Sequence, residues 1–313
     1  MTPGSPRAPR PNPLPWSERI VSYGIRAPLF FLGTGLFGSF ALAASLFDRG
    51  GRLQHRIARL WARFCVAVSG ARLTILNGER LTGQTAVYAC NHQSYMDTPV
   101  IFGSLPFQFR IVARHDLWTM PFIGWYLNRS GQVPVEVDTG RASVASLLSA
   151  VRTLKSGMPL FIFPEGGRTE DGHLAKFLHG PAFLAIRAQL PIVPMALTGT
   201  WELLPMHSSS FHPVPVTLAV GEPIETSGMT MRQVEELTGL LHDRIAALYY
   251  EHSWLPRPQF TGEPGGSTDS GPAQWASSAQ PGNAGSREPA AGNGTAGIAR
   301  DLAMGHSEDV ERR

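Results

Sequence analysis

The chain has 313 residues and a mildly basic balance, 27 Lys and Arg against 24 Asp and Glu, which leaves room for one large domain or two modest ones. It contains no basic run interleaved with aromatic residues, no zinc-finger spacing and no helix-turn-helix pattern, so we predict no nucleic-acid partner. The two cysteines, Cys65 and Cys90, lack a CxxC or metal-binding spacing, which argues against a disulfide framework or a metal site and favours a reducing compartment.

Both ends of the chain are predicted to be disordered. Residues 1–16 are rich in proline, and residues 256–313 are rich in Gly, Ser, Ala and Pro without a sustained apolar period. Between these ends we predict a membrane-associated two-helix segment over residues 17–70 and one folded domain over residues 71–255.

Residues 27–47 form the longest uncharged run, and a run of about 20 apolar residues is long enough to cross a bilayer as a helix. We favour a spanning or re-entrant membrane helix. A cleaved signal peptide is the first alternative, because Ala41 and Ala43 resemble a cleavage site, although the segment before the run is long for a signal peptide. A buried helix of a soluble protein fits less well, because the run contains several glycines and clustered aromatic residues.

Residues 50–70 have the pattern of an amphipathic helix. The apolar positions on one face are Leu53, Ile57, Leu60, Trp61, Phe64, Cys65 and Val68. A second stripe, without any acid, consists of Arg52, Arg56, Arg59 and Arg63. An apolar face beside an arginine face fits a membrane interface with anionic lipid, and packing on a soluble core is the alternative.

Beyond residue 70, short apolar runs alternate with helical windows. The predicted strands cover residues 72–76, 85–89, 109–113, 132–137, 160–163, 192–197 and 214–220. The predicted helices cover residues 97–103, 121–128, 142–155, 182–189 and 231–250. This alternation predicts an α/β fold in which helices cover a mixed sheet.

The motif NHQSYMD, residues 91–97, follows the second predicted strand. An acyl transfer to an alcohol needs a base for the hydroxyl proton, and a histidine such as His92 suits that role near neutral pH. Asp97 is the candidate partner that fixes the tautomer of the imidazole. Residues five apart do not share a helix face, so we expect His92 in a loop and Asp97 in the first turn of the following helix. Alone, the pattern also fits a solvated loop histidine and a capping aspartate.

The motif FPEGGR, residues 163–168, follows the fifth predicted strand. Its glycines allow close approach of the backbone to a ligand, and Arg168 can hold a phosphate through two parallel hydrogen bonds. Lys176 is a candidate for a further positive charge, and Glu165 for orienting a hydroxyl or the arginine. A tight turn with a surface Glu–Arg pair explains this motif alone equally well. No Ser or Cys nucleophile stands in an evident motif, which favours direct attack by an acceptor hydroxyl.

Together, the two motifs indicate acyl transfer to a small phosphorylated acceptor, and their order and separation resemble the lysophosphatidic acid acyltransferase family. These are the 1-acyl-sn-glycerol-3-phosphate acyltransferases, with an NHx4D box. The resemblance covers about residues 70–225. Residues 110–125 resemble the segment after the first box, residues 131–136 the second box, 163–168 the third, and 192–196 the fourth, which helps to line the substrate site.

The resemblance implies an α/β acyltransferase fold, a membrane-bound lysolipid acceptor, an acyl-CoA or acyl-carrier-protein donor, no metal and no other cofactor. It implies that His92 is the general base, that Asp97 is its partner, and that Glu165, Gly166 and Arg168 surround the acceptor. The donor is expected in the cytoplasm. Together with the arginines after the apolar run, this predicts a cell-membrane protein whose catalytic domain faces the cytoplasm, although Arg19 and Arg26 precede the run.

The sequence departs from the family at two positions. Gly167 stands where the third box usually has Thr, and Val137 stands where the second box usually ends in a phosphate-binding Arg. Arg141, four residues later, is a candidate replacement. The candidate substrate-binding residues are therefore Arg141, Glu165, Gly166, Gly167, Arg168, Lys176 and Pro194.

The predicted reaction moves a fatty acyl chain to the free hydroxyl of 1-acylglycerol 3-phosphate and gives phosphatidic acid in phospholipid biosynthesis. Because of the altered second box, the same chemistry on glycerol 3-phosphate, another lysophospholipid or an acylated amino-acid lipid stays open. A non-catalytic, membrane-tethered binding protein is less favoured, since both His92 and Asp97 are present. A secreted hydrolase would require cleavage of a signal peptide.

Overall fold

The computed structural model describes residues 14–48, 50–136 and 141–258, with the backbone alone for residues 141–143. The predicted disordered ends, residues 1–16 and 256–313, lie almost wholly outside this range, and so does Val137. Those expectations therefore stay predictions.

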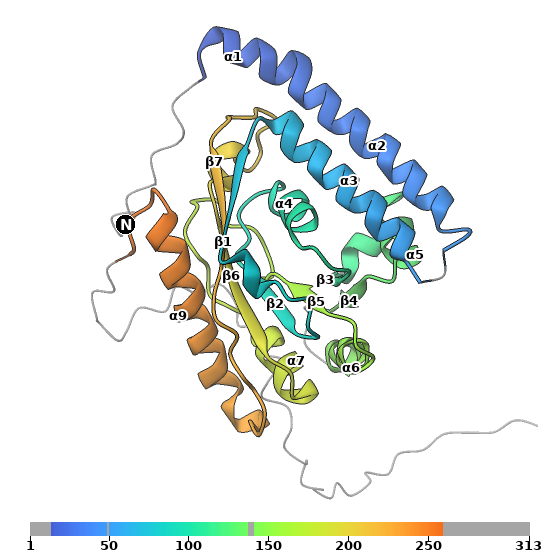
Figure 1. Cartoon of the computed structure of the whole chain (residues 1–313), viewed down its shortest axis with the longest axis vertical. Helices are drawn as coiled ribbons and strands as arrows, with labels where there is room; N and C mark the ends of the chain where they lie inside the picture. The colour runs from blue at the N-terminus through green and yellow to red at the C-terminus, as the bar shows by residue number, and fades with distance from the viewer. Residues whose placement is uncertain (1–13, 49, 137–140, 259–313) are drawn as a thin grey trace, which may run out of the picture. The chain divides into compact units, whose positions relative to one another are not determined.

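The first three elements, α1 (Trp16–Val21), η1 (Ser22–Arg26) and α2 (Ala27–Ala44), follow one another as a continuous helical rod (Figure 1). In the described part of the chain this is the one helix that is long and apolar enough to cross a membrane, by length and composition. Only 22% of its most apolar window is buried. The alternative of a core helix in a soluble protein is therefore disfavoured, because such a helix would be mostly buried.

Helix α3 (Arg52–Ser69) packs against α2 on one side and against α4 (Asp97–Ser104) on another. Two residues of the predicted apolar face, Leu53 and Leu60, are exposed, which disfavours the alternative that this whole face packs on a soluble core. Cys65 of that face is buried, and the other buried residues of α3 are small or polar, namely Gln54, His55, Ala58, Ala62 and Ser69. A helix held between two others needs small side chains where the backbones approach. At the contact with α2, a Cβ on Gly33 would lie 2.2 Å from the Phe64 ring.

A seven-stranded sheet forms the centre, with the strand order β1-β7-β6-β2-β5-β3-β4. The strands are β1 (Arg72–Leu76), β2 (Val87–Cys90), β3 (Arg110–Arg114), β4 (Val133–Val135), β5 (Leu160–Ile162), β6 (Ile192–Thr198) and β7 (Pro215–Val220). All neighbours run parallel except β6 and β7, which are antiparallel. The predicted mixed sheet is confirmed.

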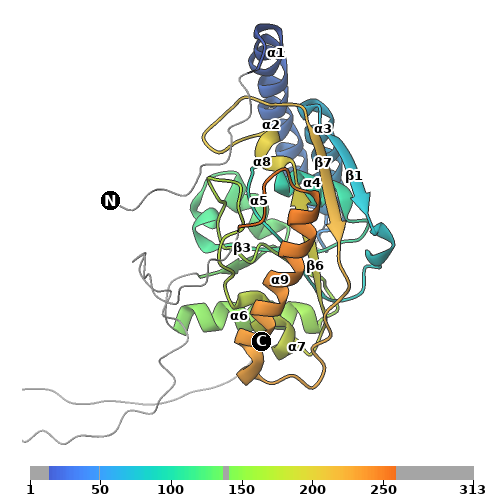
Figure 2. The same ribbon diagram turned by 90° about the vertical axis from the view of Figure 1, so that its left-hand side faces the viewer.

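Helices cover both faces of the sheet (Figure 1). One apolar cluster lies between the sheet and the α3–α4 side, and the other lies under α6, α7 and α9. Figure 2 shows α9 alongside β6. The remaining helices are α5 (Ile123–Arg129), α6 (Arg141–Lys155), α7 (Gly180–Ala188), α8 (Thr200–Leu203) and α9 (Val234–His252). The short η elements are η2 (Gly78–Arg80), η3 (His115–Thr119) and η4 (Met231–Gln233).

The sheet explains how two distant motifs meet. Strands β2 and β5 are parallel neighbours, with Ala89 opposite Ile162. The carboxyl ends of parallel strands lie at the same edge of a sheet, where loops are held by a rigid scaffold. The NHQSYMD segment follows β2 and the FPEGGR segment follows β5, so both loops leave the sheet side by side.

Candidate active site

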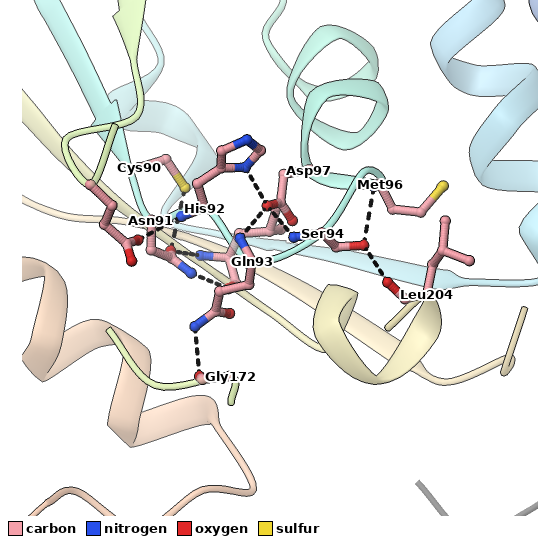
Figure 3. A network of polar contacts seen from close by, with 11 residues as sticks. Cys90, Asn91, His92, Gln93, Ser94, Met96, Asp97, Gly172 and Leu204 are labelled. Carbon is pink, nitrogen blue, oxygen red and sulfur yellow. Dashed lines mark hydrogen bonds and ion pairs between the residues drawn. The ribbon is translucent and has the colours of Figure 1, made fainter. Parts of the chain in front are cut away.

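His92 and Asp97 form a close pair at the edge of the sheet (Figure 3). Nδ1 of His92 lies 2.8 Å from Oδ2 of Asp97. The same oxygen accepts the backbone N–H groups of Gln93 at 2.6 Å and Ser94 at 2.8 Å, which fixes the carboxylate in place. As the five-residue spacing predicts, His92 lies in the loop, and Asp97 is the first residue of α4. Since Nδ1 donates to the carboxylate, Nε2 is left as the proton acceptor, and the imidazole is partly exposed.

The other polar residues of the first motif hold the loop itself. The Asn91 amide donates to the carbonyl of Leu197 at 2.9 Å and accepts from its N–H at 2.7 Å, which ties the loop to β6. The Gln93 amide donates to the carbonyl of Gly172 at 2.6 Å, and Ser94 Oγ donates to a carbonyl after α8 at 2.8 Å (Figure 3). These residues had no predicted role. The available signal was a run of polar residues between a buried strand and a helix, where buried polar groups need partners.

Phe163 and Glu165 connect the second motif to His92. The Phe163 ring stacks on the imidazole, with ring centroids 3.8 Å apart and planes 11° apart. Oε1 of Glu165 accepts the backbone N–H of His92 at 2.7 Å, and Oε2 accepts that of Ala175 at 2.9 Å. Glu165 therefore positions the His92 loop, while a direct contact with an acceptor stays a prediction.

The environment of Glu165 is unusual for a carboxylate. Burial raises its pKa to about 8, although the hydrogen bonds from Ala175 and His92 favour the charged form and lower it. The charges of Asp97 and Asp171 raise the pKa further. The carboxyl that joins the two motifs is thus able to change its charge near neutral pH.

Arg168 lies over an aromatic ring of the first motif. Its guanidinium carbon is 3.5 Å from the ring centroid of the exposed Tyr95, a cation–π contact that the sequence analysis did not predict. Gly166 has a positive φ of 70°, and a Cβ there would lie 2.6 Å from a Leu178 methyl group. A Cβ on Gly167 would meet no atom within 4 Å. The backbone therefore needs glycine at the first position, and the second faces open space.

The structure does not bring the remaining candidates into this network. Lys176 is exposed and lies one residue after Ala175, and no described hydrogen bond of the site involves its side chain. Pro194 is buried within β6 opposite Ala89. It faces the α9 side, because a Cβ on Gly221 would meet both its ring and Leu248. A role for Pro194 in lining the substrate site stays a prediction.

For Arg141 and for a metal site, the structure gives information on the described residues alone. Arg141 begins α6, but its side chain lies outside the described residues, so its proposed phosphate contact stays a prediction. No group of three or more His, Cys, Asp or Glu side chains gathers to hold a metal ion in the part of the chain that the structure describes.

The chain is similar in sequence to known acyltransferases. A family model described as "Acyltransferase" matches residues 72–198. A 1-acyl-sn-glycerol-3-phosphate acyltransferase of Chlamydomonas reinhardtii is 32% identical over 226 residues, which cover 70% of this chain and 67% of that protein. A chloroplastic protein of the same name from Arabidopsis thaliana is 31% identical over 205 residues, which cover 62% of this chain and 57% of that one. The chain thus spans about half to two thirds of the length of such relatives.

A solved structure shows the same fold. The crystal structure of the 1-acyl-sn-glycerophosphate acyltransferase from Thermotoga maritima aligns with a TM-score of 0.61 and 23% identity, over 72% of this chain and 94% of that one. At this identity the likeness concerns the fold.

Proposed function

The chain belongs to the 1-acyl-sn-glycerol-3-phosphate acyltransferase family, and we propose that it acylates the free hydroxyl of 1-acylglycerol 3-phosphate to give phosphatidic acid. The observation that carries this proposal is the His92–Asp97 pair, whose free Nε2 lies at the edge of the sheet that also carries Arg168. One group accepts a hydroxyl proton and the other binds a phosphate, as the two ends of this acceptor require.

The reaction requires no covalent enzyme intermediate. Nε2 of His92 removes the proton of the acceptor hydroxyl as its oxygen attacks the acyl thioester carbonyl. Asp97 stabilises the imidazolium that forms and keeps Nδ1 protonated. The tetrahedral intermediate then collapses and expels the thiolate of coenzyme A or of an acyl carrier protein, which takes the proton from the imidazolium. The stacked Phe163 ring restricts the imidazole to one orientation throughout.

The acceptor end of the site depends on Arg168. A guanidinium can hold a phosphate through two parallel hydrogen bonds, and Tyr95 keeps this guanidinium in one place before the acceptor arrives. Since a side chain that is already ordered loses less freedom on binding, the contact with Tyr95 supports acceptor affinity.

We place the protein at the cell membrane, with the domain on the cytoplasmic side where the acyl donor is expected. The apolar helix from Trp16 to Ala44 supports membrane attachment. The exposed arginines of α3 support an interface with anionic lipid on that side. Both features suit an enzyme whose acceptor and product are lipids.

A related acceptor is the second candidate. The open space beside Gly167 leaves room for a head group larger than a phosphate, and the family usually has a Thr side chain there. Another lysophospholipid or an acylated amino-acid lipid would then receive the acyl chain by the same chemistry.

An acceptor panel tests the proposal. Purified membranes that contain the full chain would receive one labelled acyl-CoA together with 1-acylglycerol 3-phosphate, glycerol 3-phosphate, a neutral lysolipid or another lysophospholipid. Membranes with His92→Ala provide the control for other acyltransferases. We expect the highest kcat/KM with 1-acylglycerol 3-phosphate. A product formed from another acceptor alone would assign the second candidate, and no His92-dependent product with any acceptor would overturn the proposed chemistry.

A further inference from the structure

The turn between η3 and α5, together with the start of α5, exposes large apolar side chains. Within six residues, Phe122 is 67% exposed, Trp125 57%, Ile123 46% and Met120 45%. We call these four residues the α5 patch. Single apolar residues on a surface need no explanation, but a contiguous apolar patch on a folded protein marks a binding surface.

The backbone at Phe122 is strained, and this conformation directs the Phe122 side chain outward. Phe122 has φ 62° and ψ −52°, and the N–H of Ile123 donates to the carbonyl of Pro121 at 2.7 Å. These are the features of a γ-turn with positive φ, which is rare and strained for a residue with a side chain. The turn is fixed from behind, because a Cβ on Gly124 would lie 2.2 Å from the carbonyl oxygen of Trp118. The protein thus maintains a strained turn that presents an aromatic ring to the outside.

The α5 patch is continuous with the apolar rod at the N-terminus. Figure 1 shows α5 beside the C-terminal end of α2. A surface cavity of about 530 Å³ lies between them, with Leu42 and Leu46 on one wall and Trp125 on the other. Leu46 and Phe47, just past the end of α2, are also exposed. The helix that is apolar enough to enter a membrane and the α5 patch therefore form one apolar surface.

Basic side chains border this surface, and the acid next to Phe47, Asp48, is bound to the start of α3, where it accepts the backbone N–H groups of Leu53 and Gln54. Arg129 lines the same cavity, where its Nη1 donates to Ser45 Oγ at 3.4 Å. Arg52 is exposed at the start of α3. The start of α3 lies next to the end of α5, because a Cβ on Gly51 would be 3.2 Å from the carbonyl oxygen of Ser130. The nearby acid of η3, Asp116, is paired with Arg114 at 3.0 Å. An apolar area with aromatic residues and a basic edge fits the interface of a bilayer that contains anionic lipids.

We propose that the α5 patch inserts into the interface of an anionic bilayer as a second membrane contact beside α2. A helix alone fixes the depth of a protein in the membrane, but leaves it free to rotate about that helix. The η3–α5 segment follows β3, which runs parallel to β5, so it leaves the sheet at the edge that carries His92 and Arg168. A second contact at this edge turns the candidate active site toward the lipid surface.

Site-specific labelling of the full chain tests this contact. Both native cysteines are buried, so an introduced surface cysteine reacts selectively with a polarity-sensitive dye. The label would be placed at Ile123→Cys in the α5 patch, at Phe40→Cys on α2 as a lipid-exposed reference, and at Leu240→Cys on α9 as a matched control; the wild-type residues at all three positions are exposed. The proteins would be reconstituted in phosphatidylcholine–phosphatidylglycerol vesicles with and without nitroxide-labelled acyl chains.

We expect the nitroxide lipids to quench the label at position 123 nearly as strongly as that at position 40, and several-fold more than that at position 240. Quenching at 123 no greater than at 240 would overturn the proposal. A label at 123 that is shielded but not quenched, with shielding that rises with protein density in the vesicles, would show that a second copy covers the α5 patch, which also overturns it. This readout requires no acyl transfer, so it is independent of the proposed function.

A variant with the double substitution Phe122→Ser and Trp125→Ser connects the contact to activity. We expect it to lose most of the quenching at position 123 and to slow transfer to a long-chain acceptor in vesicles several-fold, while transfer to a short-chain soluble acceptor stays unchanged. Leu240→Ser, which also removes an exposed apolar side chain, should change neither rate. An equal loss with both acceptors would place the α5 patch in the fold or chemistry of the site and contradict the proposed membrane contact.

Discussion

In the loops after β2 and β5, polar groups are buried and bonded to one another, whereas along α2 and the α5 patch large apolar side chains face outward. The first region is fixed by hydrogen bonds of 2.6–2.9 Å to backbone groups, such as those of Asp97 and Glu165. The second has few partners among the described residues, and we propose that a bilayer covers it. Substitutions in the first region should therefore change the rate with every acceptor. Substitutions in the second should change the rate only when the acceptor lies in a bilayer.

The largest expected effect comes from His92→Ala. Loss of a general base lowers the rate about 10²–10⁴-fold, and we expect this loss with long-chain and short-chain acceptors alike. Asp97→Asn should also lower kcat strongly, because it removes the negative charge that stabilises the imidazolium and disturbs the imidazole tautomer. The measurement is kcat in vesicles and in solution, with membrane yield as the control for folding. More than about a tenth of the wild-type rate in His92→Ala would contradict its role as base.

Arg168→Ala should give the next largest effect, on binding rather than on chemistry. Hydrogen bonds to charged groups contribute about 1.5–3 kcal/mol, so we expect KM for the phosphorylated acceptor to rise about 10–100-fold with little change in KM for the donor. Arg168→Lys should restore only part of the affinity, since lysine lacks the paired donor geometry. A defect confined to the donor KM would instead place Arg168 at the donor head group.

Glu165→Gln tests the tie between the two motifs. Glutamine keeps one acceptor oxygen but turns an NH₂ group toward a backbone N–H, so we expect a loss of stability of about 1–3 kcal/mol and a lower kcat with both acceptors. The variant should also change the pH dependence of unfolding. The pKa of Glu165 is about 8 in the folded protein against an ordinary 4.5, so its contribution to stability is full below about pH 4.5 and is lost as the pH rises through about 8.

Thermal unfolding between pH 4.5 and pH 8 measures that contribution. The melting temperature of the wild type should fall across this range more than that of Glu165→Gln. Parallel curves for the two proteins would show that Glu165 does not titrate in this interval and that its hydrogen bonds keep it charged.

Tyr95→Leu is expected to have a smaller effect than Arg168→Ala, in the same direction. An exposed cation–π contact contributes about 0.5–1 kcal/mol, which corresponds to a rise in acceptor KM of about two- to fivefold. Tyr95→Phe keeps the ring and should behave like the wild type. If the phenylalanine variant has the same defect as the leucine variant, the hydroxyl of Tyr95 acts rather than its ring.

Phe122→Gly should have the smallest effect on the chemistry and is the clearest test of the second region. Glycine adopts positive φ freely, so relief of the strained turn should stabilise the protein by about 1 kcal/mol. We expect a higher melting temperature in detergent and an unchanged rate with a soluble acceptor, together with a lower rate on vesicles. A melting temperature below that of the wild type would mean that the Phe122 ring supports the fold.

The strands and the motif order followed from the sequence because they depend on local patterns. Each predicted strand is present within a few residues, and the His92–Asp97 geometry follows from a spacing that a loop and a helix start can satisfy. The buried face of α3 did not follow, because an apolar period cannot show that a helix has neighbours on two sides and needs Ala58 and Ala62 at a close contact. The direction in which Pro194 points did not follow for a related reason, since alternation along β6 does not tell which face of the sheet a given residue faces.

The side-chain contacts between the motifs were also not predicted from the sequence. The Tyr95–Arg168 contact and the stacking of Phe163 on His92 join residues about seventy positions apart, and no periodicity links such residues. Both motifs were found as separate groups, and the sheet register decides which of their side chains touch.

The two carboxylates of the site have a consequence for where negative charge is stabilised during the reaction. The amide of His92 is bound by Glu165, and those of Gln93 and Ser94 are bound by Asp97. Three consecutive N–H groups beside the base therefore already donate to carboxyl oxygens of the protein. An oxyanion that develops on the acyl carbonyl needs its own donors, aligned before it forms. The loop that supplies the base thus cannot also supply the oxyanion hole from these amides, and acyl transfer must recruit that hole from another part of the site.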